Sequence, residues 1–341
     1  MTGALRALLG ALGLAVVALI AYLTPPVSVI TRVLLGLLSA LLLWFVWRWP
    51  QLEQRLAAAT PRSTGPTGPG AFDFALGFIT DFFDTLGIGN FAPTTAALKF
   101  TRRIADEDIP GTLNVGHALP VLTEALIFIA AIVVDARLLI TMIIASILGA
   151  WLGAGVVARL PRRAIQLGMG TALAIAAALF IGGNLHLTPL GGSATAFSGS
   201  RFLLAVGGNF VLGALMTLGI GLYAPCLIML SLLGLDPRAA FPIMMGSCAF
   251  LMPISGLRFV RSRRYSAPVA LGLALGGPPA VLIAAYVVKR LPLFWLSWLV
   301  AGVVLYAAAM MLRSALRRPQ ADRDPARATL ELAPRAARGG E

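Results

Sequence analysis

The sequence has few charged residues, few cysteines and few histidines for its length. Only 12% of its 341 residues are charged, and it contains two cysteines and two histidines. A soluble domain carries roughly a quarter charged residues, so the composition excludes a soluble enzyme and a disordered chain. Cys226 and Cys248 form neither a metal-binding spacing nor a disulfide framework. No metal and no cofactor is therefore expected.

Apolar residues make up 58% of the sequence. A membrane-spanning helix needs ~20 apolar residues, and this content corresponds to roughly ten such segments. Continuous apolar segments cover residues 5–23, 29–49, 111–134, 138–158, 164–183, 238–257, 266–288 and 293–312, and two longer segments, 71–100 and 201–235, are interrupted near their middle. The sequence predicts an all-α integral membrane protein.

A repeat divides the chain into two copies of one unit. Residues 85–93 (TLGIGNFAP) recur as residues 217–225 (TLGIGLYAP), which indicates duplication. The predicted organisation is a pair of N-terminal transmembrane helices (1–50), a cytoplasmic linker (51–70), a first transport repeat (71–183), an external loop (184–200), a second transport repeat (201–312) and a basic cytoplasmic tail (313–341).

The distribution of charge predicts the topology. Basic residues collect at cytoplasmic helix ends, and the N-terminus is taken to be inside. If each interrupted segment is a re-entrant hairpin, most of the 27 Lys and Arg residues fall in the cytoplasm. Each repeat then has a hairpin plus three crossings, so the copies are inverted. Full crossings would make the copies parallel but would spoil this separation. We therefore expect inverted repeats in the inner (plasma) membrane, with both termini cytoplasmic.

The repeated motif predicts a tight turn followed by a new helix. Gly87, Gly89, Gly219 and Gly221 allow such a turn, and a proline four residues after each Gly89 or Gly221 suits the first turn of a helix. Two helix N-termini would then lie within the membrane, approaching from opposite faces. Helix N-termini bind anions, and interrupted helices in inverted repeats mark transporter sites. The alternative is a structural kink only.

Two segments resemble the TauE/SafE sulfite exporter family, also called TSUP permeases. They are residues 77–95 (GFITDFFDTLGIGNFAPTT) and 109–117 (IPGTLNVGH), and the resemblance extends over 71–312. It implies export of small sulfur-containing or organic anions such as sulfite, sulfoacetate or thiosulfate. The usual family turn has a third glycine where this chain has Asn90 and Leu222. Together with the acids Asp81 and Asp84, this marks a divergent branch.

Three acidic residues within apolar segments are candidates for proton coupling. Asp81 and Asp84 lie three residues apart, on one face of the predicted helix. Two such close carboxylates do not both ionise easily, so one is expected to hold a proton. The alternative is that they only hold the shape of the turn. Glu124 lies deep in its helix and is either a second proton carrier or a partner of Arg137.

The candidate substrate-binding residues lie on the two turns and on the helices expected beside them. They are Gly87, Gly89, Asn90, Phe91, Ala92, Thr94, Asn114, His117, Gly219, Gly221, Tyr223, Ala224, Cys226 and Ser247. His117 either titrates during transport or is a packing residue. Cys226 either contacts a sulfur atom of the substrate or is an inert buried thiol.

The predicted function is secondary transport, namely export of sulfite or another small sulfur-containing or organosulfonate anion. The main alternative is a cation or metal permease that uses Met244, Met245, Cys248 and Met252. An intramembrane enzyme is disfavoured because Asp81 and Asp84 share one helix. The expected partners are the anionic substrate and the lipid bilayer, with no nucleic acid. A homodimer, the direction of transport and the coupling ion stay open.

Overall fold

The computed structural model describes residues 3–23, 28–59, 68–157, 162–185, 192–216, 221–290 and 292–316. Within these ranges the regular elements are helices, and one isolated β-bridge joins Ala194 and Leu235. The helices are α1 (Gly3–Leu23), α2 (Val29–Ala59), α3 (Ala71–Thr85), α4 (Phe91–Thr101), the 3₁₀ turn η1 (Asp106–Asp108), α5 (Ile109–Gly116), α6 (Ala118–Ala131), α7 (Ala136–Val157), α8 (Arg162–Asn184), α9 (Gly199–Met216), α10 (Tyr223–Leu232), α11 (Pro237–Ser262), α12 (Ala267–Arg290) and α13 (Leu293–Leu316). The prediction of an all-α protein is confirmed.

Six helical segments in the described part of the chain are long and apolar enough to cross a membrane. They are Val29–Leu56, Asp106–Ala131, Gly199–Met216, Pro237–Ser262, Ala267–Val287 and Trp298–Leu316. Large apolar side chains on the outside of the bundle, such as Leu203 and Trp151, are about two thirds exposed. Apolar residues facing outward suit a lipid environment, and the protein is a multi-pass membrane protein.

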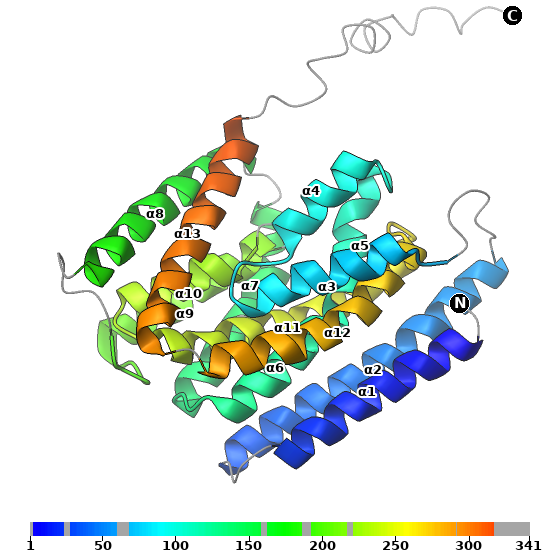
Figure 1. Cartoon of the computed structure of the whole chain (residues 1–341), viewed down its shortest axis with the longest axis horizontal. Helices are drawn as coiled ribbons and strands as arrows, with labels where there is room; N and C mark the ends of the chain where they lie inside the picture. Colours follow the sequence, from blue (N-terminus) through cyan, green and yellow to red (C-terminus); the bar gives the residue numbers. More distant parts are fainter. Residues whose placement is uncertain are drawn as a thin grey trace, which may run out of the picture.

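Helices α1 and α2 form a pair along one side of the bundle (Figure 1). The Trp49 indole N–H donates to the Tyr265 hydroxyl at 3.0 Å, and this hydroxyl donates to Glu53. Helix α2 continues through Pro50 to Ala59, so residues 51–59 are helical rather than part of the predicted linker. A proline can kink a helix without ending it, and the buried Trp49 and Glu53 hold both sides of this one in place.

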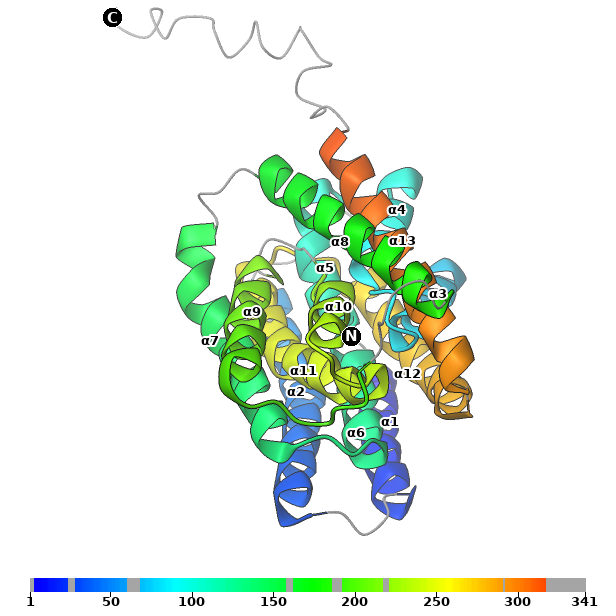
Figure 2. The same cartoon turned by 90° about the vertical axis from the view of Figure 1, so that its left-hand side faces the viewer.

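The two repeats pack crosswise. Helix α3 of the first repeat lies along α12 of the second, α9 of the second lies along α7 of the first, and α8 lies beside α13 (Figures 1 and 2). Glycines permit the close approach: a Cβ at Gly276 would lie 2.2 Å from the Phe74 carbonyl oxygen, and a Cβ at Gly149 would lie 1.8 Å from that of Phe210. Membrane helices use small residues in this way.

The first interrupted segment is a helix pair that turns back on itself. Gly87 and Gly89 have φ values of 97° and 88°, in the left-handed region that favours glycine. Arg103, just after α4, pairs with Asp73 at the start of α3, with Nη2 and Oδ2 2.7 Å apart. The hydrogen bonds to Asp73 raise the pKa of Arg103. Helix α4 therefore ends where α3 begins.

The second interrupted segment closes in the same way. The residues after α10 meet those before α9, because the Asp236 N–H donates to the Ala194 carbonyl at 2.8 Å. Gly219, most of the turn before α10, and parts of the predicted linker, external loop and tail lie outside the described residues.

The predicted span over residues 111–134 is wrong in one respect, because it is broken at His117. Helix α5 ends at Gly116 and α6 begins at Ala118. Pro120 explains the break: it cannot donate to the carbonyl of Gly116, and its ring crowds that carbonyl. The break directs His117 towards α3, where it contacts Asp81.

Candidate functional site

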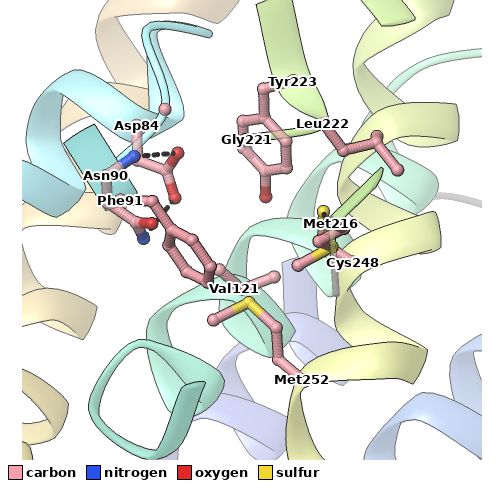
Figure 3. A pocket seen from close by; sticks show the side chains of 11 residues that line it. Asp84, Asn90, Phe91, Val121, Met216, Gly221, Leu222, Tyr223, Cys248 and Met252 are labelled. Carbon is pink, nitrogen blue, oxygen red and sulfur yellow. Dashed lines mark hydrogen bonds between the residues drawn. The ribbon is translucent and has the colours of Figure 1, made fainter. Parts of the chain in front are cut away.

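A small cavity lies where the two interrupted segments meet (Figure 3). Its volume is about 20 Å³, enough for one water-sized species. It is lined by Gly89, Asn90 and Phe91 from the first repeat, by their counterparts Gly221, Leu222 and Tyr223 from the second, and by Asp84, Val121, Met216, Cys248 and Met252. We call this space the turn cavity. Equivalent positions of the two repeats therefore face each other across it.

Asn90 joins the two aspartates beside the turn cavity. Its Nδ2 donates to Asp81 Oδ1 at 2.9 Å and to Asp84 Oδ2 at 2.7 Å, while its backbone N–H donates to Asp84 Oδ1 at 3.0 Å. Asn90 occupies the N-cap position of α4, but its side chain makes no capping bond. All three residues are buried, so the amide separates two carboxylates that share one helix face.

His117 lies behind this pair, away from the turn cavity. Its Nδ1 is 2.7 Å from Asp81 Oδ1, and its Nε2 is 3.1 Å from the Thr94 hydroxyl. Asp81 Oδ2 has no hydrogen-bond partner among the described residues. A Cβ at Gly277 would lie only 2.3 Å from this oxygen, so α12 closes the space around it.

Glu124 connects the two repeats. Its Oε2 accepts a hydrogen bond of 2.8 Å from the Tyr223 hydroxyl at the start of α10. Its Oε1 lies 2.8 Å from the hydroxyl of Thr85, the last residue of α3. Arg137 lies instead over the Phe202 ring, with 4.8 Å between its Cζ and the ring centroid. The option that Glu124 pairs with Arg137 is therefore wrong.

The two walls of the turn cavity differ in chemistry. Asp84 and Asn90 form a polar wall, the sulfur atoms of Met216 and Cys248 lie on the opposite side, and that of Met252 lies below them in the view (Figure 3). The Cys248 thiol lies 3.7 Å from the Met216 sulfur. Within the described ranges, no Lys or Arg pairs with the acids of the site. The site is therefore rich in carboxyl groups.

The two helix N-termini at the turn cavity also differ. Beside α4, the Asn90 N–H is taken by Asp84, a carboxylate from the protein itself. The N–H groups of Phe91 and Ala92 at the start of α4, like those of Tyr223 and Ala224 at the start of α10, have no acceptor within the described part of the chain. Both N-termini therefore favour an anion, but the one at α4 already holds the Asp84 carboxylate, whose place before α10 is taken by Met216.

The structure brings only some of the predicted substrate-binding residues to the turn cavity. Those that line it are Gly89, Asn90, Phe91, Gly221 and Tyr223. Among the others, Ala92 is exposed, Ala224 and Cys226 are buried, and Gly87 packs near Leu227. The Thr94 hydroxyl contacts His117, and the Ser247 hydroxyl accepts a hydrogen bond from Asn209. The Asn114 side chain bonds to the Pro110 carbonyl and to the Ser255 hydroxyl. These residues support the site or lie apart from it.

Sequence reasoning missed several residues of the site. Met216 could have been found, because it occupies the position of Asp84 in the second copy of the motif. Thr85 opens the repeated motif, but nothing marked it as a partner of Glu124. Val121 is one apolar residue in an apolar helix, and no sequence signal distinguishes it.

Comparison with known families and proteins gives one match. The family model described as Sulfite exporter TauE/SafE matches residues 2–180 and 201–339, and so covers both repeats. Neither a search of curated proteins nor a search of solved structures returned a match.

Proposed function

The chain belongs to the sulfite exporter TauE/SafE family, and from this premise we propose that it is a secondary transporter that exports a small anion. The proposed substrate is sulfite or another sulfur-containing or organosulfonate anion. The observation that carries the proposal is the turn cavity, where equivalent residues of two repeats meet beside helix N-termini. Transporters of this general design bind their substrates at such junctions.

The anion is proposed to bind on the side of α10. Both helices offer N–H groups without an acceptor, but the Asp84 carboxylate lies at the start of α4, and at α10 its place is taken by Met216. The cavity of about 20 Å³ is smaller than a polyatomic anion, so transport requires the two turns to move apart.

Proton coupling follows from the charge of the site. An anion next to Asp84 is repelled by that carboxylate when it is ionised, and the repulsion is strong where water is excluded. A proton that enters the site with the anion removes this repulsion. We propose that the acids Asp81, Asp84 and Glu124 supply the place for it.

Inverted repeats and re-entrant hairpins are supported by the positions of the helix ends. At the first hairpin, Arg103 after α4 pairs with Asp73 near the start of α3, and α5 begins close by along the chain at Ile109. Where α9 and α10 begin and end, Asp135 after α6 donates to the Thr195 carbonyl. The 26-residue segment Asp106–Ala131 separates these two ends, so the hairpins open on opposite sides of the bundle.

The proposed orientation is in the inner (plasma) membrane with both termini in the cytoplasm. Arginines gather at the end where the first hairpin opens, namely Arg102, Arg103, Arg263 and Arg264, and basic residues favour the cytoplasm. Cysteines introduced at the exposed Glu107 and Val133 test it: a membrane-impermeant maleimide added outside cells should label position 133 and spare position 107. Labelling of 107 alone would reverse the orientation.

The function is tested by flux into proteoliposomes that contain the purified protein. Sulfite and thiosulfate are supplied separately, with and without a pH gradient. The proposal predicts flux of at least one anion, driven further by the gradient. Absence of flux for both, in protein that unfolds cooperatively in detergent, would contradict it for these substrates and direct the search to larger sulfonates.

A soft-cation permease is the second candidate, because three sulfur atoms line the turn cavity opposite a carboxylate. Thioether and thiol ligands select ions such as Cu⁺. Met244 and Met245, which the sequence also offered, do not line the cavity. Ag⁺ flux in the same proteoliposomes, lost on Cys248→Ser and unaccompanied by anion flux, would favour this candidate.

A further inference from the structure

We propose that Glu124 carries a proton in this conformation and that this proton holds the two turns together around the cavity. The coupling role of the proton rests on the proposed transport function, but its position on Glu124 does not. The two hydroxyl groups that lie within hydrogen-bond distance of Glu124 come from α3 and α10, one from each repeat.

The hydrogen bonds of the Thr85 hydroxyl indicate whether Glu124 is protonated. It lies 2.8 Å from the Asp81 carbonyl oxygen and 2.8 Å from Glu124 Oε1. A threonine hydroxyl has one hydrogen and can accept two. If Glu124 is ionised, both neighbours are acceptors, and this single hydrogen cannot serve both fully. If Glu124 is protonated, Oε1 donates to Thr85 and Thr85 donates to Asp81.

The second oxygen of Glu124 fits the same assignment. Oε2 accepts from the Tyr223 hydroxyl at 2.8 Å, as the carbonyl oxygen of a protonated carboxyl group does. The chain of bonds then runs from Tyr223 through Glu124 and Thr85 to the backbone of α3, and each hydroxyl donates once. Buried polar groups favour such complete pairing.

Neither aspartate has a neighbour that would accept the hydrogen of a protonated carboxyl group in the way that Thr85 does for Glu124. Asp84 accepts two hydrogen bonds from Asn90, one from the side-chain amide and one from the backbone N–H. Asp81 Oδ1 accepts the other Asn90 hydrogen and faces His117 Nδ1, while Asp81 Oδ2 has no partner among the described residues, so a proton on it would have no acceptor. The hydrogen-bond count therefore favours Glu124 over the aspartate pair as the proton carrier.

Loss of the proton would act on the walls of the turn cavity. The titratable groups that face Glu124 are Asp81 and Asp84 from α3, Tyr223 from α10 and Cys248 from α11, with His117 at the start of its own helix next to Asp81. An ionised Glu124 competes with the Asp81 carbonyl for the single Thr85 hydrogen and repels the two aspartates. The end of α3 and the start of α10 are then free to separate.

Infrared difference spectroscopy of the purified protein tests the position of the proton. Glu124→Gln preserves the geometry, because the amide can donate to Thr85 and accept from Tyr223. The wild-type minus Glu124→Gln spectrum at neutral pH should contain the carbonyl band of a protonated carboxyl group. A difference spectrum that contains ionised carboxylate bands instead would overturn the proposal.

Two further variants keep this test interpretable. Glu53→Gln is the matched control, because Glu53 also accepts from a buried tyrosine, Tyr265, but lies far along the chain from the turns; the band assigned to Glu124 should persist in it. Tyr223→Phe removes one hydrogen bond to the carbonyl oxygen, so the band should move to higher frequency. An unmoved band would contradict the assignment even if Glu124→Gln does not fold.

Transport supplies an independent readout. In proteoliposomes, Glu124→Gln keeps its hydrogen bonds and carries no charge at any pH, so it should hold the turns together. Both the exchange of labelled for unlabelled anion at equal pH and the stimulation of flux by a pH gradient should therefore fall at least tenfold. Glu53→Gln should retain both. Full stimulation in Glu124→Gln would overturn the coupling role. Absence of anion flux in the wild type would refute the proposed function. The infrared result would still show whether Glu124 carries a proton.

Discussion

At the scale of single residues, Asn90 decides how the two aspartates coexist. Its amide donates to both carboxylates, and in the second repeat its place is taken by Leu222, where no acid pair is present. Hydrogen bonds to charged groups contribute about 1.5–3 kcal/mol each. We expect Asn90→Leu to lower the free energy of unfolding by about 3 kcal/mol or more, measured by denaturant or thermal unfolding in detergent.

The matched control for this prediction is Asn114→Leu. Asn114 is only half-buried, and its amide bonds to the Pro110 carbonyl and to the neutral Ser255 hydroxyl. Its loss should cost about 1 kcal/mol. Equal destabilisation by the two substitutions would contradict the bridging role of Asn90.

The residues of the site differ in how far the sequence predicted them. The shared helix face of Asp81 and Asp84 follows from their spacing, because three residues make nearly one helical turn. The contact between Glu124 and Tyr223 joins residues 99 positions apart, and no local pattern encodes it. Asn90 was expected to bind substrate, and its role as a bridge depends on the fold of the turn.

At the scale of helices, glycines set the crosswise packing of the repeats. Gly149 and Gly276 bring α7 to α9 and α12 to α3, and an added Cβ would meet backbone atoms that cannot move aside. Overpacking costs about 1–3 kcal/mol. Gly149→Ala and Gly276→Ala should each destabilise the protein by at least this much in thermal unfolding.

Gly302→Ala is the control for the packing glycines. Gly302 lies in α13 and is exposed, and a Cβ there would have no atom within 4 Å. Because alanine favours helix over glycine by up to about 1 kcal/mol, this variant should match or exceed the wild type. If Gly302→Ala lost as much stability as the packing variants, the close contacts at Gly149 and Gly276 would not explain the destabilisation.

The helix boundaries show where sequence patterns stop being informative. The glycine turn before α4 was predicted, because left-handed backbone favours glycine and Gly87 and Gly89 adopt it. The break at His117 was not predicted, since Pro120 lies within a continuous apolar segment. Pro50 lies within α2, which continues beyond it. Whether a proline breaks a helix depends on the packing around it.

At the scale of the whole molecule, the fold places one small cavity between two related halves. The polar wall comes from the first repeat, and all three sulfur-bearing residues, Met216, Cys248 and Met252, come from the second. The duplication was predicted from the repeated motif. The pairing of α3 with α12 and of α9 with α7 was not, because contacts between repeats leave no periodic signal.

If the anion passes between the two turns, a bulky side chain at Gly221 will block its path, and Gly221→Leu provides one. Gly221 lines the turn cavity, and a Cβ there would meet no atom within 4 Å. The leucine can therefore fill the anion path without disturbing the fold. Gly302→Leu, on the exposed face of α13, adds the same side chain elsewhere.

The measurement is sulfite and thiosulfate flux in proteoliposomes with equal amounts of each folded variant. The account predicts that Gly221→Leu reduces flux at least tenfold, while Gly302→Leu transports as the wild type does. Wild-type flux through Gly221→Leu would contradict the account, because the anion would then cross the protein by a route outside the turn cavity.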